Sequence, residues 1–175
     1  NGRRRQRQMC IRDRLNTVNA TSITATVAQT TAANIAAISV DNSSRTSLNA
    51  FTFTVSDTTA SASALNSVKA ITSVAPVFTS VTGITSSSAA DIVTLYTGTN
   101  ATLGNETIVI SDTTLAAATL NAIDGYTTSL VTATAATTIT GLVADVNTAY
   151  VNANAAPATI TGLGNEAVTI TDTSI

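Results

Sequence analysis

The stretch LGNETIVISDTTL, Leu103–Leu115, returns sixty residues later as LGNEAVTITDTSI, Leu163–Ile175. A more degenerate copy, NAFTFTVSDTTA, occupies Asn49–Ala60, and its Asp57 matches Asp112 at an offset of 55 residues. A recurring internal period is the signature of repeat proteins, in which each unit buries its apolar face against its neighbours. The sequence therefore predicts a repeat array.

Two further blocks recur between these copies. A Leu-Asn pair follows the aspartate by eight residues at Leu65-Asn66 and Leu120-Asn121, and Leu15-Asn16 is the remnant of a third. The blocks AANIAAI, AADIVTLY and VADVNTAY begin at residues 32, 89 and 143. The predicted turns, spaced by 26 to 31 residues, fall near Thr26, Asp57, Gly83, Asp112, Gly141 and Asp172. The long repeat therefore divides into half-repeats of about 26–31 residues, within the range of solenoid proteins.

The pattern inside a half-repeat predicts a strand followed by a short helix. In Thr137–Thr140 and Val168–Thr173, threonine alternates with Val or Ile, which is typical of a half-buried strand. Ala116, Leu120 and Ile123 form one stripe of a short helix. We therefore expect an α/β fold, a β-rich solenoid of stacked strand–short-helix repeats with a parallel sheet. The alternative is a tandem β-sandwich, which is less favoured because one sandwich needs about 100 residues.

The first fourteen residues differ from the rest of the chain. They contain six of the eight basic residues, the one cysteine (Cys10) and the one methionine (Met9). The run RRQRQMCIRDR, Arg4–Arg14, resembles the conceptual translation of a sequencing-library adapter. We therefore expect residues 1–14 to be an artefactual, disordered leader, and residues 15–175 to be the repeat array of a metagenomic fragment truncated mid-repeat. The competing interpretation is a basic arm that binds nucleic acid or a membrane.

Composition excludes several classes of function. Without residues 1–14, two basic and nine acidic residues remain, a formal net charge of −7, so we expect no nucleic-acid partner. The chain has no histidine, and the remainder has no cysteine, which excludes a His-based triad and thiolate or imidazole metal ligands. Acidic residues are spread singly and aromatic residues make up 3%, which disfavours a polysaccharide enzyme. We expect no enzyme, no catalytic, cofactor or metal site, and no membrane span, because no apolar run approaches about 18 residues.

The recurring Asp57, Asp112 and Asp172 have two interpretations. They could bind calcium at successive turns, although each turn supplies a single carboxylate. Alternatively each forms an Asx-turn or an N-cap, because SDTT and TDTS precede alanine-rich helices. The structural interpretation is favoured, and calcium remains the alternative cofactor.

Asparagine and threonine supply the other candidates. Asn66 and Asn121 would either join backbone groups of neighbouring turns as a buried ladder or lie solvated on a helix. Outward threonine rows could bind ice, but threonine is also a common polar residue on any solvated strand face. The second interpretation is favoured because the pairs have no constant period. The candidate pairs are Thr52/Thr54, Thr138/Thr140, Thr159/Thr161 and Thr169/Thr171.

The blocks SDTTLAAATLNAID, TTITGLVADVNTAY and ITGLGNEAVTITDT resemble repeats of giant cell-surface proteins of cyanobacteria and other aquatic bacteria, which include adhesin, motility and haemolysin-type proteins. The resemblance covers about residues 15–175. It implies an extracellular or cell-surface location and a structural or adhesive role in a large secreted protein. The 36 threonines and 10% charged residues fit an exported protein. The expected partners are neighbouring repeats of the same longer chain and a cell-surface glycan. The alternative function is a ligand-binding solenoid for calcium, glycan or ice.

Overall fold

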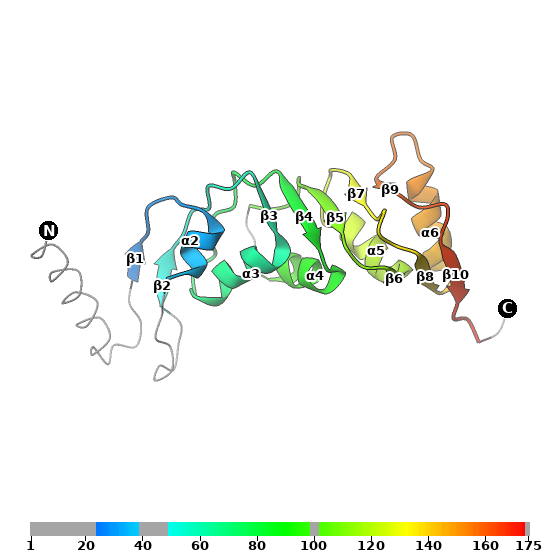
Figure 1. Ribbon diagram of the computed structural model, residues 1–175, viewed down its shortest axis with the longest axis horizontal. Helices are drawn as coiled ribbons and strands as arrows, with labels where there is room; N and C mark the ends of the chain where they lie inside the picture. The colour runs from blue at the N-terminus through cyan, green and yellow to red at the C-terminus, as the bar shows by residue number, and fades with distance from the viewer. Residues whose placement is uncertain (1–23, 39–48, 99–101, 174–175) are drawn as a thin grey trace, which may run out of the picture.

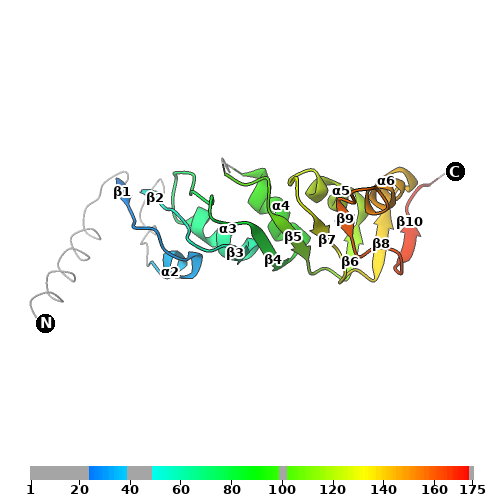
Figure 2. The same cartoon turned by 90° about the horizontal axis from the view of Figure 1, so that it is seen from above.

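The computed structural model describes residues 24–38, 49–98 and 102–173, which form a mixed α/β structure. Short strands and short helices are arranged along the longest axis, from β1 at the N-terminal end to β10 at the C-terminal end (Figure 1), and the view from above shows the same direction (Figure 2). The described sheets are open and do not close into a barrel. The predicted α/β class with parallel sheets is confirmed, whereas the prediction for residues 1–14 lies outside the described residues.

All described strand pairs are parallel. They form a two-stranded sheet β1-β2, a five-stranded sheet in the order β3-β4-β5-β7-β9, and a three-stranded sheet in the order β10-β8-β6. Parallel neighbours need a crossover connection, and here the helices supply it. An antiparallel sandwich does not have this pairing. The strands are β1 (Thr24–Thr26), β2 (Ala50–Thr52), β3 (Thr59–Ser61), β4 (Gly83–Ser87), β5 (Thr107–Ile110), β6 (Thr114–Ala116), β7 (Val131–Thr132), β8 (Thr138–Gly141), β9 (Ile160–Thr161) and β10 (Ala167–Ile170).

The helices are short and each packs beside the next. They are α2 (Ala32–Ala36), α3 (Ala62–Ala70), α4 (Ala89–Thr97), α5 (Ala117–Asp124) and α6 (Val143–Ala153). The hydroxyls of Thr31, Ser61 and Ser88 cap α2, α3 and α4. In contrast, the residues that precede α5 and α6, Ala116 and Leu142, have no side chain that caps their own helix. Helices of this length are marginal on their own in water, so their stability comes from packing.

The core contains a row of aliphatic side chains contributed by successive strand–helix units of the chain, which we call revolutions. Ile84 of β4 pairs with Ile108 of β5, Ile108 pairs with Val131 of β7, and Val131 pairs with Ile160 of β9. All four side chains are buried. Complete burial of such a side chain contributes about 1.5–3 kcal/mol, but only when the neighbouring revolution is present to exclude water. The apolar side chains of one revolution are therefore buried only when the next revolution packs against them.

The predicted helical stripe is correct at two of its three positions. Leu120 and Ile123 of α5 are buried, as expected. The third member is Ala117, which is buried, whereas Ala116 is exposed at the end of β6. The chain stays extended through Ala116, so this side chain points to the outer face like that of Thr114, two residues earlier. The helix starts one residue later than the pattern indicated.

Candidate functional site: polar links between successive revolutions

Each recurring aspartate binds the start of a helix one revolution earlier in the chain. The N–H of Ala89, the first residue of α4, donates to Asp112 Oδ2 at 2.7 Å. The first N–H of α2 donates to Asp57 and that of α6 to Asp172, both at 2.7 Å. The first N–H groups of a helix have no partner within the helix, and a carboxylate there also interacts favourably with the helix dipole.

The prediction that these aspartates cap helices is therefore correct in kind but wrong about which helix. Each was expected to cap the alanine-rich helix that follows it in sequence. Parallel stacking instead places the end of the strand beside the first turn of the preceding helix. The three carboxylates are bound to three different helices rather than gathered together.

At the starts of α3 and α5, a small residue occupies the position that the aspartate has at the other helices. The N–H of Ala62, the first residue of α3, donates to Ser87 Oγ at 2.9 Å. At α5 the corresponding residue is Gly141, and a Cβ there would lie 3.3 Å from the Cβ of Ala117. Gly83, predicted to end a strand, instead begins β4, and Ser87 ends it. The residues that face successive helix starts are Asp57, Ser87, Asp112, Gly141 and Asp172.

The two asparagines also connect neighbouring helices. Asn66 Nδ2 donates to the carbonyl of Asp91 in α4, and Asn121 Nδ2 donates to the carbonyl of Asp145 in α6, both at 2.9 Å. The Oδ1 atoms of both asparagines are buried without a hydrogen-bond partner. The predicted link to backbone groups of the neighbouring turn is present at both asparagines, although their side chains are only partly buried.

A buried carboxylate, which the sequence analysis did not single out, lies in the turn before β5. Glu106 is 3% exposed, and its Oε2 accepts from the Tyr96 hydroxyl at 2.7 Å and from the N–H groups of Gly104 and Asn105. Tyr126 stacks on Tyr96 with ring centroids 5.3 Å apart. Burial raises the pKa of the Tyr96 hydroxyl, and its hydrogen bond to Glu106 and the negative charge there raise the pKa further.

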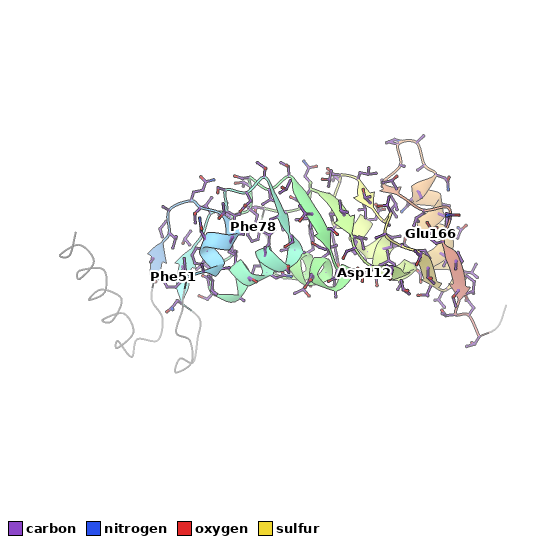
Figure 3. The ribbon with its side chains drawn as sticks, viewed as in Figure 1. Phe51, Phe78, Asp112 and Glu166 are labelled. Carbon is purple, nitrogen blue, oxygen red and sulfur yellow. The ribbon has the colours of Figure 1, made fainter. Side chains whose placement is uncertain are left out.

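The same arrangement recurs sixty residues later at the other copy of LGNE. The Tyr150 hydroxyl donates to Glu166 Oε2 at 2.8 Å, and the N–H of Gly164 donates to both carboxylate oxygens. Partial burial, and then the hydrogen bond and charge of Glu166, raise the pKa of Tyr150 to about 12. Burial raises the pKa of Glu166, but hydrogen bonds from Gly164 and Tyr150 outweigh it, so the net shift is downward. Figure 3 shows Glu166 near the C-terminal end and Asp112 further back along the molecule.

Lys69 binds the C-terminal end of the neighbouring helix. Its Nζ donates to the carbonyls of Thr94 at 3.2 Å and Leu95 at 2.8 Å, in the last turn of α4. Gly98 leaves the necessary room, because a Cβ there would lie 2.5 Å from Nζ. Burial lowers the pKa of the Lys69 ammonium. A cation at a helix C-terminus stabilises it through the exposed carbonyls and the dipole.

Threonine hydroxyls also bind backbone carbonyls that lie 21 to 24 residues earlier in the chain. Thr72 Oγ1 donates to the carbonyl of Phe51, and Thr127 Oγ1 donates to that of Glu106, both at 2.6 Å. The hydroxyls of Thr82 and Thr137 each bind a carbonyl 24 residues earlier. Threonine therefore links segments of the chain that are 21 to 24 residues apart, a structural use beyond its strand propensity.

The predicted T-x-T pairs lie in different sheets and do not form one row. Thr140 of β8 pairs with Thr169 of β10 on one side but with Ala116 of β6 on the other. The other candidates are Thr52 in β2, Thr54 in a bridge to Val77, Thr138 in β8, Thr161 in β9, and Thr159 and Thr171 beside β9 and β10. The structure therefore brings threonines together in short groups broken by alanine.

Within residues 24–38, 49–98 and 102–173, no three His, Cys, Asp or Glu side chains are grouped as a metal ion would require. None of the described helices combines the length and the apolar character needed to cross a membrane.

Comparison with known protein families, curated proteins and solved structures finds no match to this chain.

Proposed function

We propose that this chain is a structural or adhesive repeat segment of a large secreted or cell-surface bacterial protein, and that its revolutions stack as a solenoid. The supporting observation is the direction of its polar side chains. Carboxylate, amide, ammonium and hydroxyl groups bind the backbone of the adjacent revolution, at separations of 21 to 29 residues. In a ligand pocket, such groups converge on a concavity. Here they hold successive revolutions together.

A stack of this kind lengthens without changing its cross-section, because each revolution contacts only its neighbours. It is suited to hold another domain at a distance from a cell. The expected partners are therefore neighbouring repeats of the same longer chain, with a cell-surface glycan as the partner that adhesion would add. The resemblance to repeats of giant bacterial surface proteins supports the same role.

The hydrogen bonds also bear on calcium as the alternative ligand. The carboxylate of Asp112 already accepts a helix N–H at 2.7 Å, as do those of Asp57 and Asp172. Calcium takes six to eight oxygen ligands. Calcium at these positions would have to displace the helix caps and recruit most of its ligands elsewhere, so we favour the structural role.

Labelling of intact cells tests the proposed location. An antibody against residues 102–173 is applied to the bacterium that encodes the chain, before and after permeabilisation, with a cytosolic protein as the control. We expect labelling of intact cells, removed by brief external protease treatment. Labelling that requires permeabilisation would refute a surface location.

A further inference from the structure

The C-terminal end of the described chain exposes a group of large apolar side chains. Val168 and Ile170 of β10 are 44% and 40% exposed. In Figure 1, β10 and α6 form this end of the molecule. The other exposed apolar residues of this region are Leu142, Val143 and Val151.

The matching residues are covered one repeat earlier. Ile108 and Ile110 of β5 correspond to Val168 and Ile170 at an offset of sixty residues, and they are 0% and 1% exposed. In that copy, β7 pairs with β5, with Val131 opposite Ile108. The helix that leads to β7 is α5, which packs against α4, the counterpart of α6. The structure thus contains, within itself, an example of what covers this surface.

The backbone of β10 is oriented to accept such a strand. The N–H groups of Ala167 and Thr171 donate to carbonyls of the revolution that contains β8. Successive residues of a strand direct their N–H groups to opposite sides. The N–H groups of Val168 and Ile170 therefore point away from β8, toward the free edge.

We infer that this end is a docking surface for one class of repeat unit. The unit has the chemistry of residues 114–132: a Thr-Leu-Ala strand, a helix with a Leu/Ile stripe, and a Val-Thr strand that adds in parallel to β10. The other class of unit, built like residues 138–161, does not match, because β8 already pairs with β10 on the opposite edge. This inference rests on the stacking in the proposed function and specifies the neighbour that the stack requires.

Extension of the chain tests the inference. Residues 174 and 175 correspond to 114 and 115, so a second copy of residues 116–142 appended after residue 175 continues the repeat in register. The matched control appends residues 143–169 instead, an insert of equal length from the other class. Hydrogen exchange of the Val168 and Ile170 amides is measured in the original chain and in both extended chains.

We expect the in-register extension to slow exchange of these two amides at least tenfold and to raise the thermal midpoint, and the control extension to do neither. The double substitution Val168→Lys and Ile170→Lys should abolish the gain, whereas Val74→Lys, at an exposed valine away from this end, should leave it unchanged. If both extensions protect these amides equally, the surface does not select between the two classes of unit, although stacking itself is retained. Protection by neither would overturn the docking surface itself, and the cell-labelling result would still decide the surface location independently.

Discussion

Replacement of Asp112 by alanine removes one link between revolutions. The Asp112 carboxylate accepts the N–H of Ala89 at 2.7 Å, in a partly buried position. Loss of a helix cap costs about 0.5–2 kcal/mol, and loss of a negative charge at a helix N-terminus costs about 0.3–1 kcal/mol. Because this bond is short and partly buried, we expect Asp112→Ala to lower the free energy of unfolding by about 1–2 kcal/mol.

Urea denaturation followed by circular dichroism measures this change, and hydrogen exchange of the first amides of α4 reports where it acts. Asp112→Asn retains an oxygen acceptor but not the charge, so it should cost less, about 0.3–1 kcal/mol. Ser111→Ala, at the adjacent exposed residue, should stay within about 0.5 kcal/mol of the original chain. If Asp112→Ala is as stable as Ser111→Ala, or if the first amides of α4 exchange no faster, the Asp112 carboxylate does not stabilise α4.

Three further predictions concern other contacts. Asn121→Asp places a carboxylate against a backbone carbonyl, so we expect a loss of more than about 1 kcal/mol at pH 7, recovered below about pH 4; a loss independent of pH would contradict this. Gly162→Ala should destabilise the chain more than Gly164→Ala in thermal melts, because only the first Cβ meets backbone atoms within 3 Å, although both glycines have positive φ; equal losses would argue against that close contact. The pKa of Tyr150 is raised to about 12 in the folded chain, so its stabilising effect is complete below about pH 10 and is lost as the pH rises toward 12. Tyr150→Phe should flatten this alkaline loss, and an unchanged pH profile would exclude titration of Tyr150 as its source.

The fold class was predictable because its evidence is local. Alternation of threonine with Val or Ile marks strands, and the recurrence of LGNE marks the repeat without knowledge of any contact. The partner of Asp112 was not predictable in the same way. Which helix it caps depends on how one revolution packs against the next. The sequence of a single repeat does not determine that register.

Some of the polar links between revolutions were predictable from the sequence and others were not. Asn66 and Asn121 were identified because they recur at a fixed offset, and the structure places both against the next helix. Glu106 was missed because glutamate is almost never fully buried unless it is paired. The available signal was the recurrence of this glutamate together with a tyrosine at the end of the preceding helical block, Tyr96 and Tyr150.

Small-angle X-ray scattering of the chain in solution tests most directly whether neighbouring revolutions supply one another's interior along a rod. A compact globule of 175 residues has a radius of gyration of about 16 Å, and an unfolded chain of this length about 44 Å. Stacked revolutions predict an intermediate value, a rod-like cross-section region and a pair-distance distribution with a long, decaying tail. A symmetric, bell-shaped distribution with a radius of gyration near 16 Å would contradict the stack.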